Sequence, residues 1–168
     1  MSLVIRPAHT HDPEELERVG RLTLDAYAAD GFVTADDDYA DHLRDATSRA
    51  GQAELYVALA EQGRLVGTVT FCPEGSRYRE LAGPGEGEFR MLAVGADARG
   101  RGVGEALVRA CLERATELGY VALVLSSMPS QTQAHRLYER LGFRRTPDLD
   151  WSPVAGVDLL GYRLDLTG

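Results

Sequence analysis

A glycine- and arginine-rich segment at residues 99–104 constrains most strongly how this chain folds and what it binds. Its three glycines alternate with two arginines and a valine, between an apolar β-type segment at 89–94 and an amphipathic helical segment. Glycines let a backbone approach a ligand closely, and the start of the following helix presents unpaired N–H groups at a positive dipole end. The arginines add charge-assisted donors that suit phosphate oxygens. The segment therefore predicts a cradle for a pyrophosphate group.

Specific residues count against two familiar nucleotide loops. A dinucleotide-binding fingerprint needs a third glycine three residues after Gly104, where Leu107 stands. It also needs an acidic residue about 20 positions further on, where the chain is apolar around Val124. A Walker A loop needs Lys and then Ser or Thr after its second outer glycine. Gly95 and Gly100 have the required spacing, but Arg-Gly follows them.

Hydrophobic periodicity predicts a single α/β domain over residues 1–168, because this length suits one domain and no repeat or linker divides the chain. Asp12 is predicted to cap the first helix, with Pro13 at its first position and Glu15 where a capping box places a carboxylate. The predicted order is strand, two helices, three strands, helix, strand, helix and two strands, with helices on both faces of a mixed sheet. The strands are expected at residues 3–5, 54–60, 65–71, 89–94 and 121–125, from residue 143, and at 157–166. The helices are expected from 13 to near 31, from 36 through 43, and at 103–118 and 134–141.

Composition and charge exclude several classes of partner. Eighteen basic and 26 acidic side chains give a formal net charge of −8, so neither nucleic acid nor an anionic membrane surface is expected as a partner. A net negative charge suits a cationic or amine partner better than an anionic one. The two cysteines lack the spacing of a zinc knuckle or a disulfide framework, and no metal site is expected. Since no apolar run reaches bilayer length and the first residues lack a signal-peptide pattern, the expected location is cytoplasmic.

Two segments resemble the motifs of the GCN5-related N-acetyltransferase (GNAT) superfamily. Its signature is Arg or Gln, two residues, Gly, one residue, then Gly or Ala, and Arg99, Gly102 and Gly104 match it. Residues 91–94 resemble the strand that leads into this loop. Residues 134–143, which read Ala-His-Arg-Leu-Tyr-Glu-Arg-Leu-Gly-Phe, resemble the second motif of the family. The resemblance implies a mixed, mostly antiparallel sheet with helices on both faces and a splayed pair of parallel strands.

The resemblance also implies acetyl-CoA as co-substrate. Similar proteins bind it in the cleft between the splayed strands and pass the acetyl group directly to an amine. Position 131 often carries Asn in relatives, and here it is Gln. The cofactor-binding residues implied by the resemblance are Leu92, Ala93, Val94, Arg99, Gly100, Arg101, Gly102, Val103, Gly104 and Gln131.

Two residues match catalytic positions of the superfamily. Tyr138 matches the tyrosine assigned as general acid, and Glu88 matches a glutamate that is the general base in some members. A base or a desolvated site is needed because a primary amine with a pKa near 10 is neutral for about one part in a thousand at neutral pH, a cost of roughly 4 kcal/mol. The amide of Leu92 is expected to polarise the thioester carbonyl. The residues alone also allow a packed core tyrosine at 138 and a solvated carboxylate at 88.

These features predict an N-acetyltransferase that acts on a primary amine of a small molecule, a peptide N-terminus or a lysine. A non-catalytic CoA-binding sensor of the same fold is the alternative, and an ATP- or NAD-binding enzyme is a third hypothesis. The acceptor is expected against residues 27–47, where Tyr27, Phe32 and Tyr39 are candidates, and against an exposed, mobile loop at 72–87. Carboxylates at 36–38 would recruit a cationic acceptor. A homodimer through the C-terminal strands is implied by the resemblance only.

Overall fold

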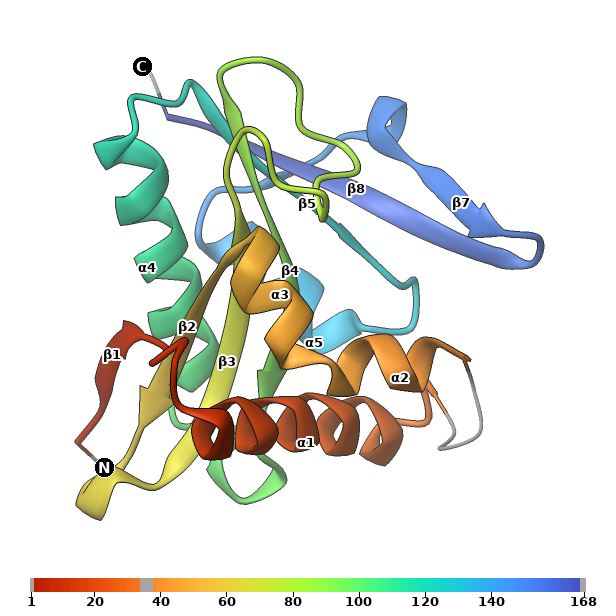
Figure 1. The fold of residues 1–168 in the computed structure, drawn as a ribbon. Coiled ribbons are helices and arrows are strands. Elements are labelled where there is room, and N and C mark those ends of the chain that lie inside the picture. Colours follow the sequence, from red (N-terminus) through yellow and green to blue (C-terminus); the bar gives the residue numbers. More distant parts are fainter. Residues whose placement is uncertain (1, 34–37, 167–168) are drawn as a thin grey trace.

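One mixed sheet is the framework that positions the site. The computed structural model describes residues 2–33 and 38–166, in which the strands run in the order β1-β2-β3-β4-β5-β8-β6, with β7 paired to the first residues of β8 (Figure 1). Neighbouring strands are antiparallel except for the parallel pair β4 and β5. The predicted mixed, mostly antiparallel sheet is thereby confirmed. The strands are β1 (Val4–Pro7), β2 (Glu54–Leu59), β3 (Leu65–Cys72), β4 (Glu86–Val94), β5 (Ala122–Ser127), β6 (Arg144–Arg145), β7 (Trp151–Val154) and β8 (Val157–Asp165).

Helices cover both faces of the sheet, as predicted. Figure 1 shows three of them together on the near side, namely α1 (Pro13–Ala29), α2 (Asp38–Arg44) and α3 (Ala46–Gln52). The other two, α4 (Val103–Glu117) and α5 (Thr132–Arg140), pack on the opposite face. Among the described residues, no helix is long and apolar enough to cross a membrane.

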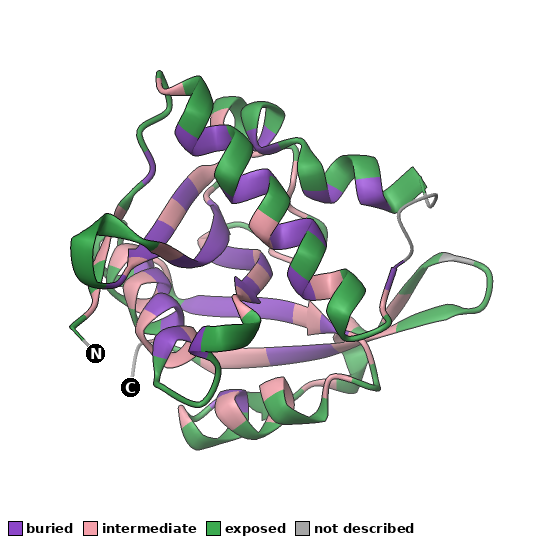
Figure 2. Cartoon of the chain, turned by 90° about the horizontal axis from the view of Figure 1, so that it is seen from below, coloured by how far each residue is buried: buried purple, intermediate pink, exposed green. Residues whose placement is uncertain are grey.

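Each face of the sheet has its own buried apolar cluster, and the helices turn their buried positions inward (Figure 2). Gly20 lets α1 lie close to the end of α2, because a Cβ at this position would be only 2.0 Å from the carbonyl oxygen of Arg44. The cluster under α4 and α5 includes Val69, Phe71, Phe89, Leu107, Cys111 and Leu123. Two clusters lie under α1, α2 and α3. One includes Leu16, Val19, Ala46, Leu55 and Val57. The other includes Leu24, Ala40, Leu43 and Met91.

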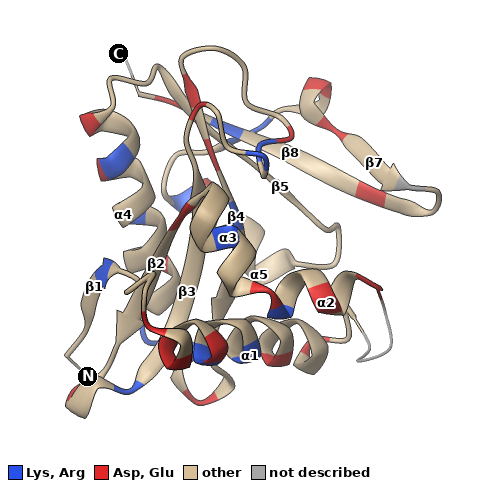
Figure 3. Cartoon of the chain, viewed as in Figure 1, with Lys and Arg blue, Asp and Glu red and all other residues tan. Residues whose placement is uncertain are grey.

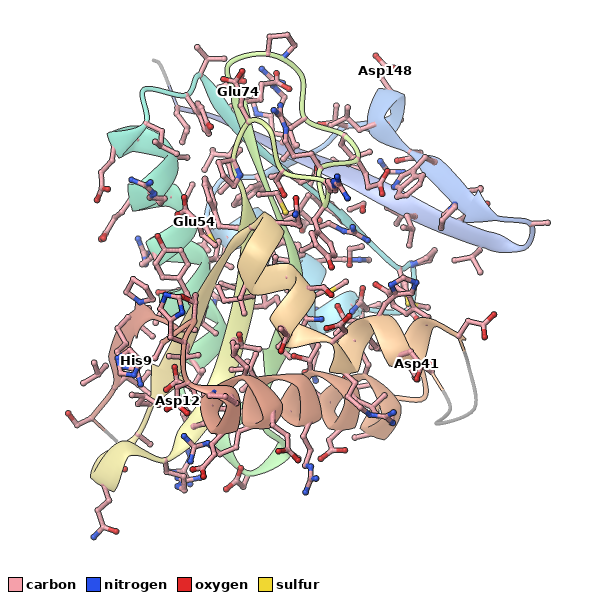
Figure 4. All side chains as sticks on the ribbon, viewed as in Figure 1. His9, Asp12, Asp41, Glu54, Glu74 and Asp148 are labelled. Carbon is pink, nitrogen blue, oxygen red and sulfur yellow. The ribbon has the colours of Figure 1, made fainter. Side chains whose placement is uncertain are left out.

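The start of α1 follows the sequence prediction in part. The Asp12 carboxylate accepts hydrogen bonds from the amides of Glu14 (3.1 Å) and Glu15 (3.3 Å), so the predicted cap is confirmed. His9 and Asp12 lie side by side there (Figure 4). The predicted capping box is wrong, since the Glu15 carboxylate accepts from the His9 amide at 2.5 Å and from Arg6 at 2.6 Å. The Arg6 hydrogen bond, opposed in part by desolvation, lowers the pKa of Glu15 to about 2.

Two elements differ from the predicted order. Helix α3 was not predicted because its few apolar residues give no helical period, although Asp45 caps it through the Ser48 amide at 3.0 Å. Strand β7 was not predicted because it contains Pro153, which is tolerated only at a sheet edge such as this one. The strand predicted from residue 143 is only two residues long, and Asp36 and Asp37 lie outside the described residues.

Strands β4 and β5 separate after a short stretch of pairing. Their parallel register pairs Glu86 with Ala122 and continues only as far as Glu88 with Val124, although β4 extends six residues beyond Glu88. On its other edge β4 has a register shift against β3, and Met91 there has a positive φ of 55°. The predicted splayed pair is therefore present. It leaves an edge of β4 without a β5 partner from Phe89 to Val94.

Candidate active site

The α4 cleft lies where β4 leaves β5, and its volume is about 580 Å³. It is bounded by the end of β4, the start of α4, the first turns of α5 and the end of α1. The structure brings together most of the residues predicted to bind the cofactor, but Arg101 does not line the cleft. The predicted residues that do are Leu92, Ala93, Val94, Arg99, Gly100, Gly102, Val103, Gly104 and Gln131.

The floor of the α4 cleft is built to accept an anion. Gly100 and Gly102 have positive φ angles of 76° and 82°, a conformation that favours glycine. Gly102 is also the N-cap of α4 and supplies no side chain to satisfy the first amides of the helix. The N–H groups at the start of this 15-residue helix are thus available to a phosphate, at the positive end of the helix dipole. These features fit the pyrophosphate of CoA.

Side chains around the α4 cleft are held by partners inside the protein. Arg99 donates to the Asp30 carboxylate at 2.6 Å and to the Ala26 carbonyl at 3.4 Å, which ties the glycine loop to the end of α1. The Gln131 side-chain oxygen accepts from the Ser127 hydroxyl at 2.9 Å and from the Met128 amide at 2.8 Å. Its side-chain NH₂ group is therefore the part left to contact a ligand.

A matched pair of glycine variants tests the cradle. A Cβ at Gly104 would lie 3.4 Å from Leu137 and 3.8 Å from Val94, in ordinary contact, so Gly104→Ala should keep acetyl-CoA affinity. Gly102→Ala forces an L-residue into the left-handed region and should lower the free energy of unfolding by about 1–2 kcal/mol. We expect this second variant also to weaken acetyl-CoA binding, as measured by calorimetric titration. Equal affinity in the two variants would contradict the cradle.

A second cavity, the α3 cleft, lies on the other side of β4 and has a volume of about 640 Å³. It is enclosed by α2 and α3, the loop between β3 and β4, and strand β7. Met91 lines the α3 cleft, and its neighbour Leu92 lines the α4 cleft, so the two cavities flank β4 at consecutive residues. The side chains around the α3 cleft include Tyr39, His42, Arg77, Tyr78, Glu80, Arg90 and Trp151.

Of the residues named individually for the acceptor, Tyr39 lines the α3 cleft, while Tyr27 and Phe32 line the α4 cleft. Both predicted acceptor segments contribute to the α3 cleft, residues 27–47 through Tyr39, His42 and Thr47 and residues 72–87 through Arg77, Tyr78 and Glu80. Most of the α3 cleft was not predicted residue by residue. Its members come from loops, short helices and an edge strand, and no motif marks them. The loop at residues 72–87, predicted to be exposed, is half-buried over much of its length because it forms a wall of this cleft.

Tyr138 lies in an aromatic cluster beside the α4 cleft. Its ring centroid is 5.8 Å from that of Phe89, 6.0 Å from Phe143 and 5.8 Å from Tyr162. The residue lines neither cleft, although its neighbour Leu137 lines the α4 cleft. Its hydroxyl has no hydrogen bond to a described residue and is not completely enclosed. Burial raises the pKa of Tyr138, which keeps the hydroxyl protonated.

Glu88 is completely buried and lines neither cleft. One carboxylate oxygen, Oε1, accepts hydrogen bonds from three consecutive amides, those of Glu80 (2.9 Å), Leu81 (2.8 Å) and Ala82 (3.0 Å). The other oxygen, Oε2, is enclosed and has no hydrogen-bond partner among residues 2–33 and 38–166. Glu88 therefore fastens the loop that walls the α3 cleft, and its general-base role stays a prediction.

No thiol or metal centre accompanies the clefts in residues 2–33 and 38–166. Cys72 and Cys111 are both buried, and burial, reinforced by the charge of Glu88, raises the pKa of Cys72 to about 12. Such a thiol is a poor nucleophile at neutral pH. Within those residues no group of three or more His, Cys, Asp and Glu side chains is placed to hold a metal ion.

The fold and the α4 cleft together define the class of protein. A parallel strand pair that splays apart, with a glycine-rich loop and an uncapped helix start at the opening, has a shape and a set of donors that fit an extended, pyrophosphate-bearing acyl carrier. This is the arrangement of a CoA-dependent acyltransferase.

Comparison with known proteins agrees with that class. The sequence matches the acetyltransferase (GNAT) family model over residues 18–143. It is 31% identical over 126 residues to an uncharacterized N-acetyltransferase of Schizosaccharomyces pombe, an alignment that covers 75% of this chain and 72% of the relative. The chain therefore belongs to the GNAT family of acetyl-CoA-dependent N-acetyltransferases. It spans only about a quarter to just under half the length of several other curated relatives.

Solved structures share the fold. A GNAT-family acetyltransferase of Staphylococcus aureus superposes with a TM-score of 0.74 at 16% identity, covering 99% of this chain and all of the other. A chain from the NatC complex bound to Gag peptide and CoA superposes with a TM-score of 0.70 at 20% identity, again over 99% and 100% of the two chains. At these identities the likeness concerns the fold.

Proposed function

We propose that this protein transfers the acetyl group of acetyl-CoA to a primary amine, with the cofactor in the α4 cleft and the acceptor in the α3 cleft. One observation carries the proposal. Met91 and Leu92, adjacent on β4, line the two cavities, so a thioester in one cleft and an amine in the other would meet at the splayed strand.

The α4 cleft offers a distinct group to each part of the cofactor. The amides of the glycine loop and the start of α4 would hold the pyrophosphate, and the Gln131 side-chain NH₂ group would donate to the same molecule. The unpaired edge of β4, through backbone groups of Leu92 and Val94, would pair with the pantetheine arm as an added strand does. When bound, acetyl-CoA supplies the activated acetyl thioester.

The protein's own residues then move protons and exclude water. Tyr138 keeps its proton because burial raises its pKa, which suits a general acid for the departing thiolate. The amide of Leu92 would stabilise charge on the thioester oxygen. Enclosure of the acceptor in the α3 cleft lowers the cost of presenting a neutral amine, and Glu88 is the residue to test as a base.

The acceptor belongs to the amines of small molecules, peptide N-termini or lysines. The NatC neighbour, bound to a Gag peptide, is consistent with a peptide in such a cleft. The α3 cleft, at about 640 Å³, has a volume that suits a small molecule or a terminal residue.

Thermal unfolding with acetyl-CoA, CoA, dephospho-CoA, ATP and NAD in parallel tests the cofactor. A ligand at 100 times its dissociation constant stabilises by about 2.7 kcal/mol, and for a domain of this size the midpoint should rise by roughly 5–10 °C. We expect the rise with acetyl-CoA and CoA and not with ATP or NAD. The release of free CoA is then measured with a panel of amines. Release with any amine indicates an enzyme, whereas binding of acetyl-CoA without release indicates a CoA-binding sensor. Absence of any rise with acetyl-CoA or CoA would contradict the proposal.

A further inference from the structure

The α3 cleft has a basic lining although the protein carries a formal net charge of −8. Arg77 and Arg90 line it, and Glu80 is the one carboxylate among its described lining residues. Figure 3 shows basic segments on α3 and in the β3–β4 loop. The cationic acceptor predicted from the carboxylates at 36–38 finds no support in this lining, and Asp36 and Asp37 lie outside the described residues. An anionic group on the acceptor matches this lining.

Arg90 keeps most of its hydrogen-bonding capacity free. It lies on β4 directly before Met91, and its side chain is 18% exposed. The guanidinium nitrogen Nη1 donates to the Tyr78 carbonyl at 3.1 Å and forms an ion pair with the Glu80 carboxylate at 3.9 Å, which leaves Nη2 and Nε without a hydrogen bond to a described residue. A guanidinium offers several N–H donors in a planar fork that matches a carboxylate. The remaining donors of Arg90 are therefore available beside the point where the two clefts flank β4.

A third guanidinium lies close behind the wall of the cleft. Arg49 on α3 is 1% exposed, and its Nη1 donates to the His42 carbonyl at 2.6 Å. Its Nε is enclosed with no partner in the described part of the chain, and burial lowers its pKa. The Asp45 carboxylate is a charged group that counters part of this shift. A buried positive charge without a close counter-ion is costly, and an anion in the adjoining cleft would offset part of that cost.

Aromatic side chains also line the cleft. Tyr39, Tyr78 and Trp151 line the cleft, with Pro153 beside the tryptophan. Rings of this kind bury the apolar part of a ligand, whereas the arginines fix a charged group. The Trp151 indole Nε1 is enclosed without a partner among the described residues, so a further donor lies in the same lining. The cleft thus joins one apolar surface to one site for an anion.

We propose that the acceptor carries a carboxylate as well as the reactive amine, as an amino acid does, and that Arg90 and Arg77 bind this carboxylate. The proposal rests on the proposed function, because it names the acceptor class for the same cleft. Arg90 precedes Met91 on the splayed strand, so a carboxylate bound there leaves a nearby amine facing the point where the two clefts flank β4. The aromatic side chains then contact the acceptor's side chain.

Matched acceptors test this assignment. CoA release is measured with the common amino acids, their carboxamides and the corresponding amines that lack the carboxyl group, together with a polyamine. A hydrogen bond to a charged group is worth about 1.5–3 kcal/mol, so kcat/KM for an acid should exceed that for its amide by about 10- to 100-fold. Arg77→Gln and Arg90→Lys should raise KM for the acids with little change in kcat and leave the amides unaffected.

Arg136→Gln is the matched control, since Arg136 is exposed on α5 and lines neither cleft. Arg77 is exposed on a loop, so its replacement leaves the fold intact even if Arg90→Lys is unstable. Equal or better turnover of amides or of the polyamine would overturn the inference. So would the absence of both turnover and saturable calorimetric binding for every acid. In either case acetyl-CoA stabilisation with turnover of some other amine would leave the proposed function standing.

Discussion

Replacing Glu88 with alanine should lower the free energy of unfolding by about 2–4 kcal/mol. The change removes the carboxylate oxygen, Oε1, that accepts hydrogen bonds from three backbone amides. Each unpaired buried donor costs about 1–3 kcal/mol, and the part-exposed loop lets water recover some of that. The same loop places Arg77, Tyr78 and Glu80 on the α3 cleft. The alanine variant should therefore also raise KM for the acceptor while the affinity for acetyl-CoA is kept.

Glu88→Gln separates the loop-fastening role from the general-base role. A glutamine oxygen can still accept the three amide hydrogen bonds, but the side chain can no longer take a proton. Since Glu88 is fully buried and lines neither cleft, we expect the glutamine variant to keep kcat within about tenfold of the wild type. Denaturant unfolding of both variants measures the change in the free energy of unfolding, and steady-state kinetics measures the change in kcat. A stable glutamine variant with kcat reduced 100-fold or more would establish the base role instead.

The cofactor side of this protein could be predicted from the sequence because its requirements are local. A phosphate cradle needs closely spaced glycines and the start of a helix, and residues 99–104 supply both within one short segment. The strand that leads into the loop and the helix that follows it are continuous in sequence. Nearly every residue predicted there lines the α4 cleft, and the exception is Arg101, an exposed residue of the loop.

The acceptor side could not be predicted in the same way because it is assembled from distant segments. Arg90 alternates with buried neighbours on β4 and reads as an ordinary strand residue until Tyr78 and Glu80 are folded against it. Trp151 lies on an edge strand whose proline argues against a strand at all. Short elements of this kind carry little periodicity, so their positions come from packing rather than from local pattern.

Two carboxylates show how tertiary partners override a local prediction. Glu15 occupies the capping-box position of α1, yet it binds Arg6 on β1 and the His9 amide. Glu88 lies in β4 at the position that the resemblance matches to a base, and its carboxylate fastens the β3–β4 loop. In neither case did the sequence predict the hydrogen-bond partners, and the general-base role of Glu88 stays a prediction. Spacing depends on one element, whereas a partner depends on how several elements pack.

Tyr138→Phe should lower kcat by about 10²- to 10⁴-fold while the stability changes by less than about 1 kcal/mol. The ring would keep its packing against Phe89, Phe143 and Tyr162, and the lost hydroxyl has no hydrogen bond to a described residue. Any large fall in rate would then report the chemistry of the hydroxyl. Tyr162→Phe is the matched control, because it removes another hydroxyl from the same aromatic cluster and should leave kcat unchanged.

The pH profile strengthens the Tyr138 test. Burial raises the pKa of Tyr138 above its ordinary value of 10, and a raised pKa means that the acid stays protonated to higher pH. Wild-type kcat/KM should therefore rise between about pH 7 and 10 as the acceptor amine loses its proton, with no descending limb from Tyr138. The phenylalanine variant should show the same rising limb at a uniformly lower rate. If its kcat stays within about threefold of the wild type, Tyr138 is a packing residue of the aromatic cluster and the departing thiolate takes its proton from another donor.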